Sequence, residues 1–278
     1  MSNIAVVGGA GYVGLAYSAA LAELGRTVTA LDLDEGKIHE LSQGRTTIFE
    51  PGLEELLKRG LASRRLRFTT QYSEALSDAA FAFICVGTPP SASGRADTTY
   101  VKEAARSIAR HARGQVTVVN KSTMPLGSVH LVERILQENV VGDTVFSVVS
   151  NPEFLREGSA VHDIFNPDRI VLGTDDPEAA QRVAELYESL GATVLITTPH
   201  SAEMIKYAAN AFLATKISFI NEIALICEPM GLTWSCGQGD GYGRQDRAAL
   251  SCERARVLAA RAFRRMCRLW PRWLATPM

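Results

Sequence analysis

Residues 4–14 read Ile-Ala-Val-Val-Gly-Gly-Ala-Gly-Tyr-Val-Gly, an apolar run that ends in closely spaced glycines. Gly9, Gly11 and Gly14 follow the pattern G-x-G-x-x-G, directly after an expected strand and at the start of an expected helix. In this pattern the first two glycines permit a tight turn and a close approach of the backbone to a pyrophosphate, and the third lets the helix pack on the strand. The stretch therefore predicts a dinucleotide-binding fold.

The same turn predicts which dinucleotide is bound. The first N–H groups of the helix, at Tyr12 and Val13, lie at the positive end of its dipole, where phosphates bind. Asp32 ends the next expected strand, at about the twenty-residue interval where an acid binds the adenosine ribose. Because a carboxylate there disfavours a 2′-phosphate, we expect NAD rather than NADP.

A second glycine spacing fits the same turn. Gly8, Gly11 and Gly14 match the G-x-x-G-x-x-G pattern of short-chain epimerases and reductases. Those enzymes need a Tyr-x-x-x-Lys pair for proton transfer, and no tyrosine of this chain has a lysine at that spacing. The first interpretation is therefore preferred.

Beyond this turn, short apolar runs alternate with helical patterns. The expected strands are Ile4–Val7, Thr27–Asp32, Leu66–Thr69, Ala80–Val86, Val116–Asn120, Val145–Ser150, Ile170–Gly173 and Thr193–Thr197. The expected helices are Tyr12–Leu24, Lys37–Leu41, Leu53–Lys58, Val101–His111, Val129–Gln137 and Pro177–Leu190, then a longer one from the N-cap Ser201 to about Glu228. This alternation predicts an α/β fold, a Rossmann-like doubly wound parallel sheet followed by a long connecting helix.

Composition narrows the class of protein. The formal net charge is -1, so the chain as a whole lacks the excess of positive charge that is typical of nucleic-acid-binding proteins. The N-terminus lacks the basic and apolar regions of a signal peptide, and no apolar run reaches the length of a membrane span. The histidines and cysteines show no metal-ligand spacing; the cysteines are Cys85, Cys227, Cys236, Cys252 and Cys267. We therefore expect a cytoplasmic protein that binds no metal, nucleic acid or membrane.

Three further loops follow the carboxyl ends of expected strands, where open α/β sheets bind ligands. They are Val86–Pro89, Lys121–Pro125 and Asn151–Glu157, and each carries hydroxyl or carboxylate side chains. Each loop alone has an alternative interpretation as turn or capping chemistry. At successive strand ends, the three loops together indicate a functional crevice.

These motifs, in this order, resemble the UDP-glucose/GDP-mannose dehydrogenase family. The resemblance covers about residues 3–231 and rests on Gly-Tyr-Val-Gly-Leu, Glu50-Pro-Gly-Leu53, Val-Gly-Thr-Pro, Lys-Ser-Thr-x-Pro, Asn-Pro-Glu-Phe-Leu-Arg-Glu-Gly, Asn166-Pro-Asp-Arg-Ile170, Ala202–Asn210 and Phe219–Glu222. The Asn-Pro-Asp-Arg-Ile segment is closer to the UDP-glucose branch than to the GDP-mannose branch. The resemblance implies an NAD-binding domain over residues 1–199, a connecting and dimer-forming helix over 200–231, a nucleotide-sugar substrate and a full-length homodimer.

The resemblance also implies a chemistry. In the family the sugar C6 alcohol becomes a carboxylate in two oxidations that reduce two NAD; a cysteine thiolate traps the aldehyde, and water cleaves the resulting thioester. Glu153 would be the acid/base, Thr123 would hold the catalytic water or hydroxyl, and Lys206 with Asn210 would stabilise the oxyanion. Around the cofactor the implied residues are Thr88 and Glu157 on the nicotinamide side, Lys37 on the adenosine side, and Ser122 and Thr123. Beside the sugar they are Glu153, Phe154, Leu155, Arg156, Glu157, Lys206 and Asn210. Lys206 has an alternative interpretation as a solvated helix lysine.

The family's nucleophile is missing from the sequence as written. Its motif, Gly-x-Gly-Gly-Ser-Cys-Phe-Pro-Lys-Asp, does not occur in the 278 residues. The resemblance also leads us to expect that the C-terminal domain, which binds the nucleotide end of the sugar donor in the family, is missing. Cys85 lies in the expected strand Phe81–Val86 and is expected to be an inert core residue. Cys227 comes before the position of the family's nucleophile. Two functions stay open: a dehydrogenase of UDP-glucose, or of another nucleotide sugar such as GDP-mannose, whose complete form is catalytic, and a non-catalytic, truncated NAD-binding module.

The tail, residues 232–278, is rich in Arg, Trp and Cys and shows no helical or strand period. When the codons of Asp240–Arg247 are read one base later, they permit Met-Gly-Met-Asp-Gly-Arg-Ile-Gly. When those of Arg256–Cys267 are read two bases later, they permit Gly-Phe-Gly-Gly-Ser-Cys-Phe-Pro-Lys-Asp-Val, the missing motif. We therefore predict that the tail is a frame-shifted reading of the family's continuation and packs poorly; the alternative is a divergent tail.

Overall fold

The computed structural model describes residues 3–91 and 96–227 of the chain. The chain divides into two compact units. The first contains the residues up to Pro89 and Asp97–Lys206, and the second contains Pro90–Ala96 and the residues from Tyr207 onward. The predicted tail at 232–278 lies outside the described residues, so the frame shift stays a prediction.

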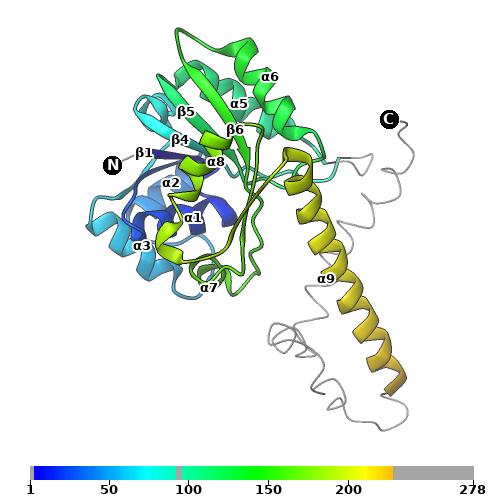
Figure 1. The fold of residues 1–278 in the computed structure, drawn as a ribbon. Coiled ribbons are helices and arrows are strands. Elements are labelled where there is room, and N and C mark those ends of the chain that lie inside the picture. The colour runs from blue at the N-terminus through cyan, green and yellow to red at the C-terminus, as the bar shows by residue number, and fades with distance from the viewer. Residues whose placement is uncertain (1–2, 92–95, 228–278) are drawn as a thin grey trace. The chain divides into compact units, whose positions relative to one another are not determined.

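The first unit is built on one eight-stranded sheet with the strand order β3-β2-β1-β4-β5-β6-β7-β8 (Figure 1). Strands β1 to β6 pair in parallel, which confirms the Rossmann-like sheet. The strands are β1 (Asn3–Val7), β2 (Thr27–Leu31), β3 (Leu66–Thr69), β4 (Ala79–Ile84), β5 (Gln115–Asn120), β6 (Val145–Ser150), β7 (Ile170–Gly173) and β8 (Val194–Thr197).

One edge of the sheet departs from the predicted parallel arrangement. β7 runs antiparallel to β6 through the pair Ser150 and Gly173, and β8 is parallel to β7. A parallel neighbour needs a crossover connection, usually a full helix. The connection from β6 to β7 contains only the six-residue helix α7 (Ala160–Phe165), and the rest of it is loop. In the observed structure this connection brings the chain back in the opposite direction.

Helices cover both faces of this sheet. With α7 they are α1 (Tyr12–Glu23), α2 (Glu35–Ser42), α3 (Leu53–Ala62), α4 (Tyr72–Leu76), α5 (Thr99–His111), α6 (Ser128–Asn139) and α8 (Pro177–Ala184). The sequence pattern missed α4 and α7, because five or six residues are too few to show a helical period. The single helix predicted over Pro177–Leu190 is two elements, since α8 is followed by a separate 3-10 turn at Glu188–Leu190.

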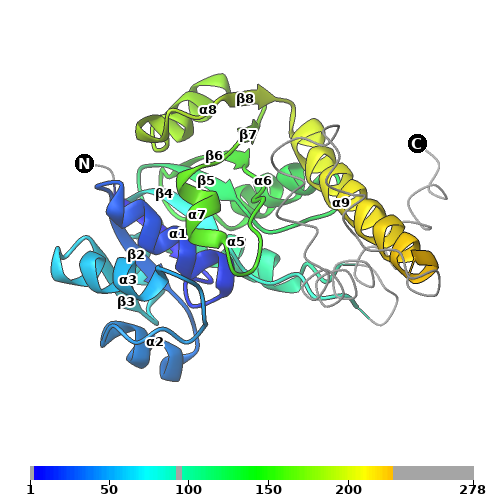
Figure 2. The ribbon, with the colours of Figure 1, turned by 90° about the horizontal axis from the view of Figure 1, so that it is seen from below.

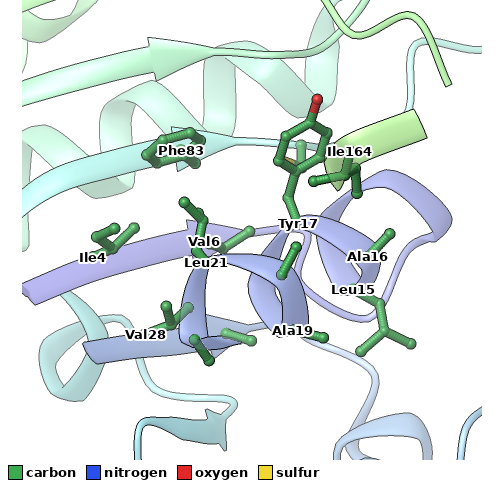
Figure 3. Close-up of a cluster of buried hydrophobic side chains, with 14 of the residues drawn as sticks. Ile4, Val6, Leu15, Ala16, Tyr17, Ala19, Leu21, Val28, Phe83 and Ile164 are labelled. Carbon is green, nitrogen blue, oxygen red and sulfur yellow. The ribbon is translucent and has the colours of Figure 1, made fainter. Parts of the chain in front are cut away.

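Side chains alternate along the strands and divide the core into two layers. Ile4 and Val6 of β1 belong to one cluster together with side chains of α1, α3, α7 and α8. Ala5 and Val7 belong to the other cluster together with α5 and α6. Figure 2 shows helices on both sides of the sheet, and Figure 3 shows the first cluster around α1. Because both faces are buried, the loops at the strand ends are where chemistry can occur.

The long connecting helix is α9 (Pro199–Cys227), which begins in the first unit and continues into the second. The Thr198 hydroxyl accepts the N–H of Ser201 at 3.3 Å, so Thr198 is the N-cap. The prediction of Ser201 as the cap is wrong, because Pro199 suits the first helical position. Within the described part of the chain, no helix is long and apolar enough to cross a membrane.

Candidate functional site

The glycine turn between β1 and α1 packs tightly on its neighbours. Gly8, just before the predicted motif, has a φ of 83°, a left-handed conformation that favours glycine. A Cβ at Gly9 would lie 2.7 Å from the Cβ of Ala30 on β2, and a Cβ at Gly14 would lie 2.1 Å from the Gly8 carbonyl oxygen. Gly14 therefore brings α1 close to the turn itself. A Cβ at Gly11 would meet only the Gly8 oxygen, at 3.3 Å, among the described residues.

Asp32 lies beside this turn, directly after β2. Its Oδ2 accepts the Ala10 N–H at 3.1 Å, and its Oδ1 accepts the Asp34 N–H at 3.2 Å. Lys37, predicted on the adenosine side, lies in the first turn of α2, and its Nζ pairs with the exposed Asp34 at 3.5 Å. The end of β2 thus holds a carboxylate against the glycine turn.

The loops after β4 and β5 are joined by hydroxyl groups. Thr88 donates from Oγ1 to the carbonyl oxygen of Thr123 at 2.8 Å. Ser122 donates from Oγ to the carbonyl oxygen of Val86 at 2.7 Å. Three predicted site residues, Thr88, Ser122 and Thr123, are therefore brought together at adjacent strand ends.

Glu153 and Lys206 form an ion pair of low exposure. Glu153 lies in the loop after β6, and Lys206 lies near the start of α9. The Lys206 Nζ donates to Glu153 Oε1 at 2.8 Å and to the Glu153 carbonyl oxygen at 2.5 Å. The remaining carboxylate oxygen, Oε2, accepts the N–H of Leu155 at 2.7 Å. Because Lys206 is only 7% exposed, its interpretation as a solvated helix lysine is wrong.

The next three residues of the loop after β6, Phe154, Leu155 and Arg156, contact different parts of the domain. The Phe154 ring centroid lies 5.5 Å from the Lys206 Nζ, and Leu155 packs against the first core cluster. Arg156, predicted beside the sugar, is turned to α7. Its Nη2 pairs with Asp163 Oδ1 at 2.5 Å, and its N–H donates to Asp163 Oδ2 at 2.9 Å. Phe154 is thus the aromatic neighbour of the ion pair, while Arg156 is held by Asp163.

Glu50 is a buried carboxylate that the sequence motif contains but whose role the motif does not reveal. Its Oε2 accepts the Tyr12 hydroxyl at 2.6 Å and the Gly158 N–H at 2.9 Å, and its Oε1 accepts the Ala160 N–H at 2.7 Å. Burial and this carboxylate raise the pKa of Tyr12 above its usual value. Glu50 therefore joins the first turn of α1 to the end of the loop that carries the exposed Glu157.

Lys121 is a second residue without a predicted role. It directly follows β5 and is 2% exposed, and its Nζ donates to Asn151 Oδ1 at 2.9 Å and to the Asn151 carbonyl oxygen at 3.2 Å. The sequence showed Lys121 as the first residue of the Lys-Ser-Thr-x-Pro motif, directly after an apolar strand, but gave it no role. Lys121 joins the loop after β5 to the loop after β6.

The prediction that Cys85 is a core residue is confirmed, while its lack of reactivity stays a prediction. Cys85 is buried just past the end of β4, rather than inside the strand as expected, and burial raises the pKa of its thiol to about 12. A neutral thiol is a weak nucleophile. Asn210 belongs to the second unit, so its role stays a prediction, and Cys236, Cys252 and Cys267 lie outside the described residues. In the part of the chain that the structure describes, no group of His, Cys, Asp and Glu could hold a metal ion.

Sequence comparison identifies relatives across nearly the whole described chain. Residues 2–191 match the NAD binding domain of the UDP-glucose/GDP-mannose dehydrogenase family, and residues 200–235 match its central domain. UDP-glucose 6-dehydrogenase TuaD of Bacillus subtilis is 49% identical over 247 residues, which are 89% of this chain and 53% of the relative. UDP-glucose 6-dehydrogenase of Rhizobium meliloti is 48% identical over 230 residues, which are 80% of this chain and 52% of the relative. The chain spans about half the length of these relatives.

Solved structures share the fold. A UDP-glucose dehydrogenase from the archaeon Pyrobaculum islandicum matches with a TM-score of 0.79 and 44% identity, covering 84% of this chain and 54% of that chain. A GDP-mannose dehydrogenase from Pseudomonas aeruginosa, solved as a ternary complex, matches with a TM-score of 0.76 and 36% identity, covering 82% of this chain and 54% of that chain.

Proposed function

The chain belongs to the UDP-glucose/GDP-mannose dehydrogenase family, and we propose that it is the NAD-binding part of an oxidoreductase that converts the C6 alcohol of UDP-glucose to a carboxylate. One observation carries the proposal: the Glu153–Lys206 ion pair at the strand-end loops of a Rossmann-like sheet. Such a pair supplies a proton acceptor and a positive charge at one place. The relatives named UDP-glucose 6-dehydrogenase, at 49% and 48% identity, support UDP-glucose as the sugar.

The glycine turn fits an NAD pyrophosphate. Gly11 is the N-cap of α1 and has no side chain, so it does not cap the first N–H groups of the helix, at Tyr12 and Val13. The positive end of the helix dipole is therefore suited to an anion. Asp32, fixed against the turn, would accept the ribose hydroxyls and repel a 2′-phosphate, which favours NAD over NADP. When bound, NAD supplies the acceptor for the hydride.

In this proposal Lys206 stabilises the negative charge on the sugar oxygen, and Glu153 accepts protons. Oxidation of the alcohol removes a proton from its oxygen and a hydride from its carbon. Lys206 donates to the sugar oxygen and stabilises the negative charge that develops as the proton leaves. Glu153 accepts that proton and releases it to solvent, so that in the hydrolytic step it can take a proton from the water that Thr123 holds. Asn210 would orient the same sugar oxygen.

A second candidate function is a non-catalytic NAD-binding module. It is favoured by one observation: the printed sequence contains no nucleophile motif of the family. The described Cys85 does not replace that nucleophile, since burial raises the pKa of its thiol to about 12. Without a thiolate the aldehyde is not held for a second oxidation.

Two measurements separate these functions. In the first, the 278-residue chain is titrated calorimetrically with NAD and NADP and then incubated with NAD and UDP-glucose. We expect NAD binding without two NADH per sugar; two NADH per UDP-glucose would contradict the reasoning from the missing motif. In the second, a full-length version with the family reading frame restored is assayed with UDP-glucose, GDP-mannose and other nucleotide sugars.

For the full-length version we expect NADH from UDP-glucose. Glu153→Gln should lower the rate by about 100-fold or more, the range for a lost general base. It should leave NAD affinity unchanged, as should the matched exposed control Glu54→Gln on α3. Absence of NADH with every sugar would leave the non-catalytic module.

We also propose that the full-length protein is a homodimer formed through α9. Large apolar side chains of α9 are exposed, namely Met204, Phe212, Leu213, Phe219 and Leu225. At 3.6 residues per turn, Met204, Phe212, Phe219 and Leu225 fall on one side of the helix, and apolar side chains gathered on one exposed face are typical of contact surfaces. Sedimentation equilibrium of the full-length protein checks this, and a monomer at micromolar concentration would contradict it.

A further inference from the structure

Lys121 has surroundings that stability alone does not explain. Its Nζ contacts Asn151 through Oδ1 and the carbonyl oxygen and lies 3.8 Å from the ring centroid of Tyr17 on α1. None of these partners is a carboxylate. Burying an ammonium group without an anionic partner is unfavourable, and an apolar side chain of similar volume avoids that penalty. Such a local conflict is typical of functional sites.

Asn151 transmits the contact to the loop after β6. Its N–H donates to the Asn120 carbonyl oxygen at 2.9 Å, and its Nδ2 donates to the Val171 carbonyl oxygen at 2.9 Å. The Tyr187 hydroxyl donates to Asn151 Oδ1 at 2.8 Å. Asn151 is thereby fixed between β5 and β7. Glu153 follows after a single proline, whose locked φ limits how far the loop can turn between them.

The backbone of Lys121 belongs to the other loop. It leads directly into Ser122 and Thr123, whose positions are set by hydrogen bonds with the loop after β4. One side chain therefore contacts the loop of Glu153, while its own backbone carries Thr123. Figure 3 shows the third contact, Tyr17, with its hydroxyl pointing away from the aliphatic side chains of the cluster.

We propose that Lys121 is a positioning residue: its buried amine holds the loop after β6 against the loop after β5, and so fixes the Glu153–Lys206 pair relative to Thr123. The assignment rests on the proposed function, because it is there that Glu153 and Thr123 act on one water. Lys121 itself touches neither sugar nor cofactor in this proposal.

The pKa of the Lys121 amine provides a way to observe its effect on Glu153. Burial lowers the pKa of Lys121 to about 7, against the opposing effect of the Glu153 carboxylate and with a further lowering by Lys206. Burial keeps Cys85, Tyr17 and Tyr187 neutral by raising their pKa values. The titratable groups around Lys121 and its contacts are Tyr17 of α1, Cys85 after β4, Glu153 after β6, Asp163 of α7, Tyr187 after α8 and Lys206 of α9. Loss of the Lys121 proton near neutral pH therefore changes the field at Glu153.

The first test replaces the amine and keeps the volume. In Lys121→Met, hydrogen–deuterium exchange of the Glu153–Arg156 amides should be at least tenfold faster than in the parent. The melting temperature should stay the same or rise, because a buried charge is replaced by an apolar side chain. The matched control Lys58→Met, at an exposed lysine of α3, should change neither. Unchanged exchange of the loop, or uniformly faster exchange with a lower melting temperature, would overturn the proposal.

The second test uses the parent chain, so it does not depend on whether a variant folds. In the parent chain labelled at the lysine Cε and glutamate Cδ carbons, the Glu153 carboxyl signal should shift at the pH at which the Lys121 signal titrates. The charge on the Lys121 amine alone also shifts the Glu153 carboxyl signal, so amide exchange decides. Exchange of the Glu153–Arg156 amides should rise more steeply with pH above the Lys121 titration than the intrinsic chemical rate does; exchange that follows only the intrinsic rate would overturn the proposal. Neither test uses NAD or turnover. Failure of the proposed oxidation would therefore leave both results intact, and the two failures can be distinguished.

Discussion

Two alanine substitutions in the glycine turn should separate folding from cofactor binding. The Cβ of Gly14→Ala would lie 2.1 Å from the Gly8 carbonyl oxygen. An ordinary carbon–oxygen contact is about 3.3 Å, so α1 must move away from the turn by about 1.2 Å. Because α1 packs in the first core cluster, this overpacking should destabilise the chain by about 3 kcal/mol. The melting temperature should fall by roughly 6–12 °C for a domain of this size.

Gly11→Ala should behave in the opposite way. Gly11 has φ -77° and ψ 166°, which alanine adopts without strain, and its Cβ would meet only the Gly8 oxygen, at 3.3 Å, among the described residues. Stability should therefore change by less than about 1 kcal/mol. The added methyl group occupies the surface that a pyrophosphate approaches, so NAD affinity should fall at least tenfold, about 1.4 kcal/mol. Urea unfolding and calorimetric titration measure the two effects. A folded Gly11→Ala chain that binds NAD like the parent, or a Gly14→Ala chain of parental stability, would refute the reasoning.

Four further outcomes are expected. Asp32→Ala should weaken NAD binding by about 1–3 kcal/mol in calorimetric titration, and tighter binding of NADP than NAD by the parent would argue against the assignment. Burial raises the pKa of the Cys85 thiol to about 12, so Cys85 should resist iodoacetamide at pH 8 in the native chain. Peptide mass spectrometry checks this, and labelling at the rate of a free thiol would contradict it. Glu50→Gln should reduce stability by about 1.5–3 kcal/mol for each charged hydrogen bond lost, and Tyr12→Phe, which removes one of them, should reduce it less; equal losses in urea unfolding would be inconsistent. Between about pH 7 and 8.5 the Lys121 amine loses its proton in the folded chain but keeps it in the unfolded one, so its contribution makes stability rise with pH; a parental slope unchanged by Lys121→Met would exclude this.

Much of the fold follows from local sequence pattern. Each strand is rich in apolar and β-branched residues, and each expected strand lies within two residues of an observed one. What the pattern missed depends on neighbours rather than on the segment itself. The antiparallel direction of β7 depends on how the strand pairs with β6, which an apolar run does not encode, and α4 and α7 are too short to be periodic. Thr198 rather than Ser201 caps α9, because Pro199 takes the first helical position.

The sequence indicated several residues of the candidate site but not their contacts. Loops at successive strand ends indicated Glu153 and Thr123, and a motif indicated Lys206. That Lys206 and Glu153 form an ion pair depends on how α9 starts, which no spacing of 53 residues reveals. The motifs contain Lys121 and Glu50 but do not indicate their roles. Each of the two side chains connects segments that are far apart in the sequence, and that becomes clear only in the structure.

The Glu50 carboxylate has a consequence for how the domain folds. Its backbone partners, Gly158 and Ala160, come 108 and 110 residues later in the chain. During synthesis α1 and Glu50 emerge long before them, and the carboxylate must stay hydrated until the second half of the sheet has formed. Contacts between such distant segments close late, since the loop entropy is lost before the contact forms. We therefore do not expect the N-terminal part of the sheet, with α1 and Glu50, to reach its final structure by itself. Its structure is complete only when the segment that carries Gly158 and Ala160 has packed against it.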